Sequence, residues 1–326
     1  MPFTGILGQD NSIALLSRSL AAGKTAHAYL FEGIEGCGKK MTALAFIEAV
    51  FCGGTEGCGH CPPCRKISSG RHPDLHLVEP DGAYIKIDQI RELQRELAFR
   101  PFEATKKACI IDGAEKLNPS AGNALLKTLE EPPGDALLIL ITANPDGVLP
   151  TVLSRCQRLH FAALPEAAIE SILRERGTAP EAARIVASLA GGSMGKAIEI
   201  GEETALIERK SFLEKVGSLS LDEITPLFAM AEELAGDKEN TLELLGLLTA
   251  FLRDALLMRC GDSRVVNTDL LALVEREAAR FSGDDIMERI DHVTETRRAI
   301  SGNVNTRLAL EVLFMRLAEN QLNSDK

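Results

Sequence analysis

The sequence lacks the features that would place it in a membrane, outside the cell or directly on DNA. Residues Met1–Gly5 have no basic stretch followed by an apolar run, so we expect no secretory signal. The most apolar late segment, 242–258, is interrupted by Glu243, Arg253 and Asp254 and is expected to be a buried helix. Positive charge is not in excess, since the net charge is −11, whereas an independent DNA-binding protein usually carries a basic footprint. We therefore expect mainly protein partners and no membrane.

Internal repeats and low-complexity segments are also lacking. The 326 residues suffice for two or three domains, each with its own core. Hydrophobic residues make up 45% and charged residues 25% of the chain, as in an ordinary globular protein. Four of the eight cysteines are clustered at 52–64. Without a secretory signal, this pattern predicts a metal site in a reducing cytoplasm and not a set of disulfides.

The first half of the chain alternates short apolar runs with helical patterns. Four runs have the length of buried parallel strands: Tyr29–Phe31, Leu75–Val78, Ala108–Ile111 and Leu137–Ile141. Helical patterns lie between them at Lys39–Phe51, Ile87–Ala98 and Ser120–Glu130. This alternation predicts an α/β domain with a parallel sheet over residues 1–163.

The remainder of the chain is predicted to be all helical. We expect a small helical domain at 164–205 and a larger helical bundle at 206–326, because Gly/Ser breaks separate helical patterns in this half. The last long helix, at 305–320, carries a broad apolar face that includes Leu308, Leu310, Val312 and Leu313. Most of that face is expected to be core, and its width would also suit packing against neighbouring subunits.

A phosphate-binding loop stops one residue short of its usual pattern. Residues 33–39 spell G-x-x-x-x-G-K between an expected strand and an expected helix. Gly33, Gly36 and Gly38 allow backbone N–H groups to point at phosphate, and Lys39 would reach the outer phosphates. The next residue should be Ser or Thr, whose hydroxyl holds magnesium, but here it is Lys40. The alternative to a nucleotide site is a glycine-rich turn without a ligand.

The sequence departs from the pattern of an active P-loop ATPase a second time, directly after the strand expected at Ala108–Ile111. Asp112 ends this strand, at the place where such folds usually hold magnesium through a second-shell contact. Active members of the wider group carry Glu directly after that Asp, to orient water, whereas this chain has Gly113. Glu115 is expected to lie past the strand end, away from that position. A buried strand whose terminal Asp caps a turn is the favoured alternative to a hydrolytic role.

The clustered cysteines have the spacing of a structural zinc site. Cys52, Cys58, Cys61 and Cys64 follow the pattern C-x5-C-x2-C-x2-C, and four thiolates can close a tetrahedral site with no open position for water. His60 is an alternative ligand if one cysteine faces away. We predict bound zinc with a structural role.

Two further strings complete the set of motifs. The first, Asn118–Pro133, reads as an amphipathic helix, with Asn118 as its N-cap and Pro119 in its first turn. The second is Ser154-Arg155-Cys156, in which a lone Arg would ordinarily be a surface ion pair.

Together these strings resemble the bacterial clamp-loader subunits of DNA polymerase III, which belong to the AAA+ superfamily. The resemblance is carried by the string at 27–31, the G-x-x-x-x-G-K loop, the cysteine spacing, the string N-A-L-L-K-T-L-E-E-P-P at 123–133 and the S-R-C string at 154–156. It implies an AAA+ P-loop core with the zinc module at 52–64, followed by a small helical lid and an all-α collar that holds the subunits together.

The family has an ATP-hydrolysing branch, gamma/tau, and a delta-prime branch that has lost catalysis. Lys40 replaces the magnesium-binding Ser/Thr, and Gly113 replaces the acidic partner of Asp112. Gly195 stands where the motor has an Arg that senses the nucleotide. The three losses together point to the delta-prime branch, a stator with a degenerate ATP site. An active gamma/tau-type ATPase, with Thr42 or water at the magnesium site, is the alternative, and a scaffold that binds no nucleotide is a third.

The resemblance also implies a role in DNA replication. Arg155 would reach the ATP site of a neighbouring subunit as an arginine finger in trans. Thr142 matches the motor's first nucleotide sensor and would be vestigial here. The implied partners are the gamma/tau and delta subunits, with the sliding clamp and primer-template DNA reached through the complex. Bound ATP or ADP would not be hydrolysed, so we expect no independent catalysis from this component of the polymerase III holoenzyme.

Overall fold

The computed structural model describes residues 3–201, 203–262, 264–302 and 304–324. The chain divides into two compact units. One unit consists of Met1–Ala168 together with Gly192–Gly195, and the other of Ile169–Gly191 together with Lys196–Lys326. The division into three domains at 163 and 205 stays a prediction.

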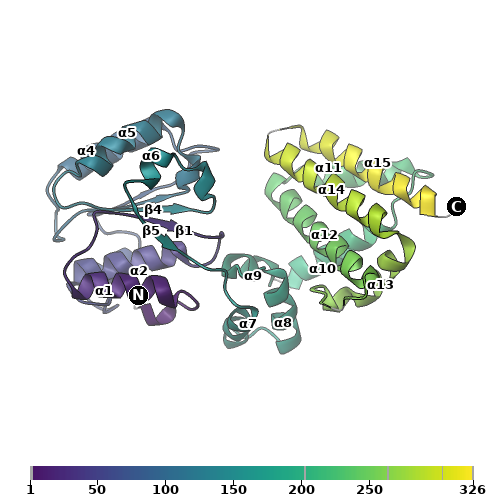
Figure 1. Cartoon of the computed structure of the whole chain (residues 1–326), viewed down its shortest axis with the longest axis horizontal. Coiled ribbons are helices and arrows are strands. Elements are labelled where there is room, and N and C mark those ends of the chain that lie inside the picture. The colour runs from purple at the N-terminus through teal and green to yellow at the C-terminus, as the bar shows by residue number, and fades with distance from the viewer. Residues whose placement is uncertain (1–2, 202, 263, 303, 325–326) are drawn as a thin grey trace. The chain divides into compact units, whose positions relative to one another are not determined.

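A five-stranded parallel sheet forms the centre of the first unit (Figure 1). In spatial order the strands are β2 (Leu75–Val78), β3 (Ala108–Asp112), β4 (Leu137–Thr142), β1 (Ala28–Glu32) and β5 (Gln157–His160). The predicted fold class and the four predicted strands are confirmed. The sequence did not reveal β5, because Leu159 is its one buried residue and no apolar run marks it.

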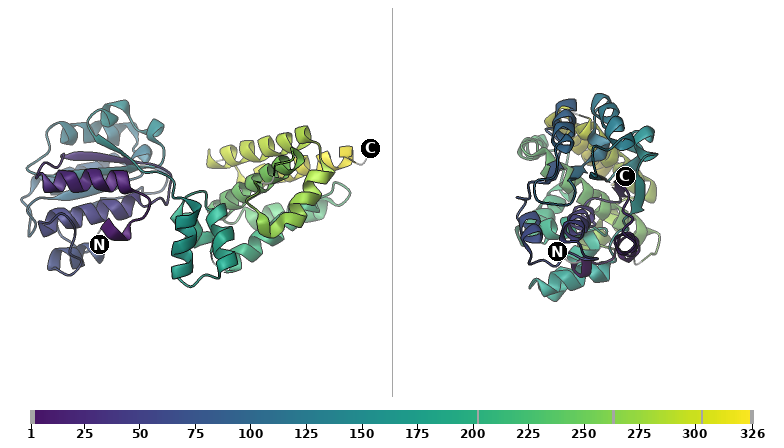
Figure 2. Two further views of the ribbon diagram at one scale, coloured as in Figure 1. Left: turned by 60° about the horizontal axis from the view of Figure 1, so that its bottom comes forward. Right: turned by 90° about the vertical axis from the view of Figure 1, so that its left-hand side faces the viewer.

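Helices cover both faces of this sheet (Figures 1 and 2). Helices α1 (Asp10–Ala21) and α2 (Lys39–Cys52) lie on one face, and α4 (Ile87–Ala98), α5 (Pro119–Glu130) and α6 (Pro150–Leu153) lie on the other. Successive strand residues alternate between the two cores, as strand geometry requires. Tyr29 and Phe31 belong to the cluster that contains Phe46 of α2, whereas Leu30 belongs to the cluster on the other face.

Helix α5 begins as its sequence predicts. The Asn118 side chain accepts a hydrogen bond of 2.7 Å from the backbone N–H of Ala121, and Pro119 occupies the first turn. Ala121, Leu125 and Leu129 are all buried, so the predicted apolar stripe faces the core. This helix carries the N-A-L-L-K-T-L-E string, whose last residue lies in the candidate site.

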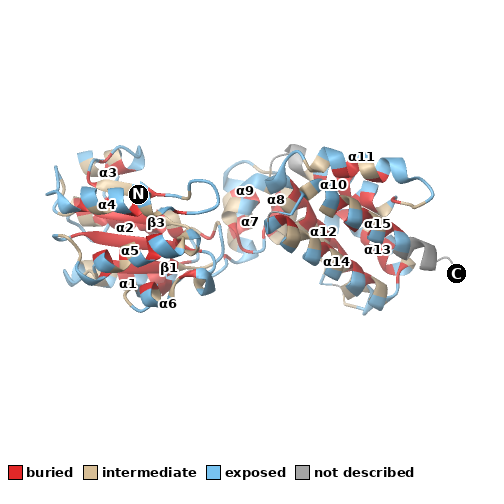
Figure 3. Cartoon of the chain, turned by 90° about the horizontal axis from the view of Figure 1, so that it is seen from above, coloured by how far each residue is buried: buried red, intermediate tan, exposed pale blue. Residues whose placement is uncertain are grey.

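The second unit is helical. It contains α8 (Pro180–Leu189), α10 (Glu203–Gly217), α11 (Ile224–Leu234), α12 (Lys238–Arg259), α13 (Leu271–Arg280), α14 (Gly283–Ser301) and α15 (Thr306–Ser324), and it shares α7 (Glu166–Glu175) and α9 (Met194–Ile200) with the first unit. Leu310 and Leu313 of α15 are buried in one core, while Leu308 and Val312 are 57% and 38% exposed. Figure 3 shows that the helices of this unit carry both buried and exposed residues. None of the described helices is long and apolar enough to cross a membrane.

Buried charges link the helices of this unit. Arg289 of α14 donates to Glu277 of α13 over 3.0 Å and to the Leu317 carbonyl of α15 over 2.8 Å, and its guanidinium stacks on Phe281. Burial lowers the pKa of Arg289, although Glu277 opposes that shift. A buried charge persists when it is paired and hydrogen-bonded, so this pair fixes three helices relative to one another.

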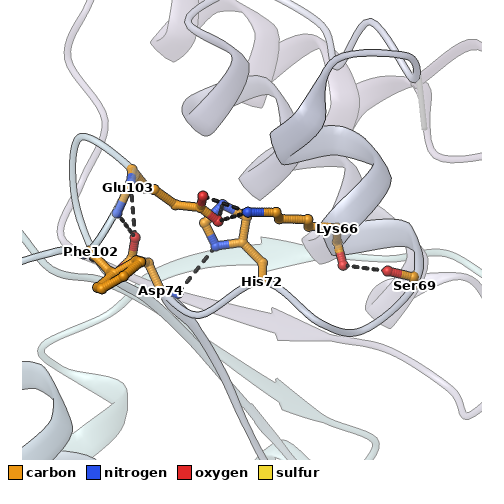
Figure 4. Close-up of polar contacts among 7 residues, drawn as sticks. Lys66, Ser69, His72, Asp74, Phe102 and Glu103 are labelled. Atoms are coloured by element: carbon orange, nitrogen blue, oxygen red, sulfur yellow. Dashed lines mark hydrogen bonds and ion pairs between the residues drawn. The ribbon is translucent and has the colours of Figure 1, made fainter.

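Asp74 fastens a loop to the start of β2 (Figure 4). Its buried carboxylate accepts hydrogen bonds from the backbone N–H groups of Phe102, Glu103 and Ala104, at 2.6, 2.9 and 2.8 Å. Burial raises the pKa of Asp74, but the three N–H groups outweigh it, so the pKa is lowered. Glu103 in turn pairs with Lys66, which ties the same loop to the helix beside the clustered cysteines.

We expect Asp74→Ala to destabilise the protein by about 3 kcal/mol, because it leaves three N–H groups without their charged acceptor. The carboxylate should contribute its full share of the free energy of unfolding above the ordinary Asp pKa of about 4. This contribution should be lost as the pH falls through the lower pKa that Asp74 has in the folded protein. Urea unfolding at several pH values measures both effects. Asp135→Ala is the control, since that side chain is largely exposed. Equal stability of the two variants at pH 7 would refute this role for Asp74.

Candidate nucleotide loop and metal-binding cysteines

The candidate nucleotide loop rises from the carboxyl end of β1. Gly36 and Gly38 adopt left-handed φ values of +72° and +101°, which glycine tolerates without strain, and α2 starts directly afterwards at Lys39. Parallel pairing sets Glu32 of β1 beside Thr142 of β4. Asp112 of β3 lies opposite Ile141 of β4. The loop, Asp112 and Thr142 therefore come together at one edge of the sheet.

Lys39 folds back onto its own loop. Its Nζ donates hydrogen bonds of 2.6 Å to the carbonyl oxygens of Gly33 and of Ile34, and the residue is buried. These two contacts must be given up if the ammonium is to reach a phosphate. Thr42 cannot take over the missing magnesium ligand in this arrangement, because its buried hydroxyl donates to the Gly38 carbonyl over 2.9 Å.

Lys40 lies on the carboxylates that would otherwise face a metal ion. Its Nζ is 2.5 Å from Glu79 Oε1 and 3.3 Å from Asp112 Oδ2. Burial lowers the pKa of Lys40. The hydrogen bond to Glu79 and the charge of Asp112 raise it by more than burial lowers it, so the net shift of the pKa is upward. The residue that replaces the magnesium-binding Ser/Thr thus brings a permanent positive charge to Asp112.

Glu115 contacts Thr142 within the site, and the sequence did not predict this contact. The Thr142 hydroxyl donates to Glu115 Oε2 over 2.7 Å and accepts from the Asn144 N–H over 3.1 Å. The chain turns at Gly113, whose φ is +82°, and continues into a 3-10 turn at Ala114–Lys116. This turn brings the Glu115 carboxylate back to the end of β4. The expectation that Glu115 does not take the place of the Glu directly after Asp112 stays a prediction, and no pattern in the sequence signals the turn that brings Glu115 to Thr142.

A second turn, Gly192–Gly195, packs on the loop within the first unit. The Gly36 carbonyl accepts hydrogen bonds from the N–H groups of Met194, at 3.0 Å, and of Gly195, at 3.3 Å. A Cβ atom on Gly36 would lie 2.2 Å from Ser193 Oγ, and one on Gly195 would lie 3.2 Å from the Gly36 Cα. Glycine is therefore required at 36, and any larger residue at 195 would press on the loop.

Arg155 joins two of the sequence motifs. Its Nε donates to Glu130 Oε1 over 2.9 Å, and its Nη1 donates to the Thr151 carbonyl over 2.9 Å. The S-R-C string thus meets the end of the N-A-L-L-K-T-L-E string, 25 residues earlier. The Arg155 side chain is 34% exposed and that of Glu130 51%, so the pair lies at the surface.

The four predicted cysteines gather into one cluster. Cys52 ends α2, Cys64 lies in α3 (Pro62–Ser68), and Cys58 and Cys61 lie between these helices. All four sulfur atoms lie within 4.8 Å of one another, with 3.8 Å between Cys52 and Cys61 and 4.0 Å between Cys58 and Cys64. Sulfur ligands of a tetrahedral zinc ion are separated by about 3.8 Å. These residues could therefore hold a metal ion such as zinc.

The thiols differ in how readily they ionise. Backbone N–H groups of His60 and Cys61 lower the pKa of Cys58, whereas burial raises that of Cys64. A metal ion would replace the proton on the buried sulfur, which is the usual coupling between thiolate binding and proton release. His60, the alternative ligand, directs its Nδ1 to the Cys58 carbonyl at 2.8 Å and is not part of the sulfur cluster.

A P-loop between β1 and α2, with Asp112 and Thr142 on neighbouring strands, defines an AAA+-type P-loop domain. Family models described as "DNA polymerase III, delta subunit" and "DNA polymerase III, delta subunit, C terminal" match residues 8–165 and 203–319. DNA polymerase III subunit delta' of Bacillus subtilis is 35% identical over 95% of this chain and 96% of its own length. The chain belongs to the delta' family of DNA polymerase III subunits.

A tau subunit is similar over a smaller part of the chain. DNA polymerase III subunit tau of Bacillus subtilis is 36% identical, but the match covers 61% of this chain and 37% of the relative. Among solved structures, a DNA polymerase III gamma subunit-related protein from Thermotoga maritima superposes with a TM-score of 0.54, at 20% identity, over 95% of this chain and all of the other. That likeness confirms the fold.

Proposed function

We propose that this chain is the non-hydrolysing stator subunit of a clamp loader, which places a sliding clamp on primed DNA during replication. Its partners would be gamma/tau and delta subunits, with clamp and DNA reached through the complex. The observation that carries the proposal is the Lys40–Asp112 ion pair, which puts a lysine where a motor needs magnesium. The similarity to a delta' subunit supports the proposal, because that match covers nearly the full length of both chains. The match to tau covers a smaller share of both chains.

Arg155 supplies chemistry to a neighbour in this proposal. An arginine finger stabilises the charge that develops on a transferred phosphoryl group, and the planar guanidinium binds phosphate through two parallel hydrogen bonds. Arg155 is partly exposed and pairs with the Glu130 carboxylate, which a phosphate of a neighbouring subunit would have to replace. Its exposed position is what a contribution in trans requires.

Arg155→Ala should lower the rate of ATP hydrolysis at the one neighbouring site that Arg155 reaches, by about 10³-fold or more. The measurement is the DNA-stimulated ATPase of the reconstituted complex. Arg155→Lys should fail as well, because the lysine keeps the charge but loses the planar fork. Arg158→Ala is the matched control, since Arg158 is also exposed and paired with a carboxylate, that of Glu32. Full activity of the Arg155→Ala complex would rule out the finger.

The chain's own loop should not hydrolyse ATP. Lys40 forms an ion pair with Asp112, and Gly113 replaces the catalytic Glu. Glu115 accepts a hydrogen bond from Thr142. We expect the isolated protein to show no ATPase above background, measured by phosphate release. Turnover that disappears in Lys39→Ala would show a working motor site and would favour the gamma/tau-type alternative.

We further propose that zinc fills the cysteine cluster as a structural ion. The separations of 3.8 and 4.0 Å between sulfur atoms match a four-thiolate site, and such a site leaves no position for catalytic water. Its role would be to hold the segment between α2 and α3, which lacks other regular structure at 53–61.

Freshly purified protein should contain about one equivalent of zinc, because four-thiolate sites bind it with roughly 10 kcal/mol or more. Elemental analysis and a thermal melt check this. Cys61→Ser should lower both the zinc content and the melting temperature. Cys260→Ser is the control, since Cys260 is an exposed thiol outside the cluster. Less than half an equivalent in the unaltered protein would contradict the site.

A further inference from the structure

Two lysines follow the glycines of the loop, and they have different surroundings. Lys39 is buried and bonded to loop carbonyls, whereas the Lys40 side chain is 41% exposed and pairs with two carboxylates. In a P-loop of the usual pattern, the second position carries the hydroxyl that binds Mg²⁺, with an Asp behind it. In this chain both the sequence position and the Asp112 contact are taken by the same ammonium group.

We propose that the Lys40 ammonium permanently replaces the divalent cation of this loop, so that the chain binds a nucleoside di- or triphosphate without Mg²⁺. This inference concerns the chain's own loop and makes no use of Arg155. It can therefore fail while the proposed function stands, and the reverse also holds.

The charges around Asp112 argue against a metal ion beside Lys40. Mg²⁺ requires near-octahedral oxygen ligands at about 2.1 Å and usually keeps several waters. An ammonium 3.3 Å from Asp112 Oδ2 and 2.5 Å from Glu79 Oε1 already pairs with one oxygen of each carboxylate. A divalent ion would have to displace that charge and then sit next to it, at an unfavourable distance for two cations.

The same residues provide what a polyphosphate needs in place of the metal. Lys39 and Lys40 are the first two residues of α2, where free backbone N–H groups and the helix dipole also attract anions. Lysine acts on phosphate as a flexible point charge, so the exposed Lys40 head group can contact phosphate oxygen while it remains close to Asp112. Lys40 brings one positive charge to the place where Mg²⁺ would bring two, and Lys39 supplies a second, as it does in a P-loop of the usual pattern.

Binding of a fluorescent ATP analogue to the full chain, with EDTA or with Mg²⁺, tests the proposal. We expect the dissociation constants of the unaltered protein in the two buffers to agree within about twofold. Lys40→Ser restores the usual residue, so it should bind at least about tenfold more weakly in EDTA and recover when Mg²⁺ is added. Lys86→Ser is the matched control, because Lys86 is an exposed lysine in a 2.6 Å ion pair with Asp81 of the same unit.

A second measurement removes the nucleotide from the test. Electron paramagnetic resonance measures Mn²⁺ binding without nucleotide. We expect Mn²⁺ to bind to Lys40→Ser, because this variant removes the ammonium that pairs with Asp112 and Glu79. The double variant Lys40→Ser/Asp112→Asn should not bind Mn²⁺. The proposal is overturned if the unaltered protein binds the analogue only with Mg²⁺, or in neither buffer. It is also overturned if Lys40→Ser binds equally well in EDTA.

Discussion

The parallel register of β3, β4 and β1 is the constraint on which the rest of the site depends. Because parallel strands end at a common edge, pairing Glu32 with Thr142 and Asp112 with Ile141 brings three loops to one place. The phosphate loop, the Asp112 carboxylate and the Thr142 hydroxyl then lie together whatever residues surround them. The fold thus keeps the geometry of a nucleotide site even where the catalytic residues have changed.

Protein groups satisfy one another at this edge. Lys40 forms ion pairs with Asp112 and Glu79, and Thr142 donates to Glu115. A motor needs these groups to exchange partners during its cycle, since only interactions that strengthen in the transition state accelerate the reaction. Here each carboxylate already has a protein partner. Retained architecture with internally paired charges is what a subunit with a structural role would require.

The sequence predicts those parts of the molecule that depend on neighbours along the chain. Apolar runs located four strands, Asn118 located the start of α5, and cysteine spacing located the sulfur cluster. Contacts between distant segments were not visible. The return of Glu115 to Thr142 depends on the left-handed turn at Gly113, and no local pattern distinguishes that turn from any other glycine.

The same limit applies to charge pairs that join separate segments. Asp74 reads as one more acidic residue in the sequence, yet it is buried and binds a loop some 28 residues away. Arg289 reads as a surface residue of an amphipathic helix, yet it is buried against Glu277. Burial and pairing of such groups follow from the tertiary fold, so they become evident only when helices and strands are assembled.

The two cations most relevant to function differ in the number of carboxylates that they contact. Lys40 has two carboxylate partners at the carboxyl ends of the strands, and these carboxylates raise its pKa. Arg155 has one carboxylate partner, in a pair exposed to water. Exposed pairs contribute about 0–1 kcal/mol, so a phosphate from a neighbouring subunit can compete with Glu130 for the guanidinium. A phosphate from a partner would thus have to replace one carboxylate at Arg155, but two at Lys40.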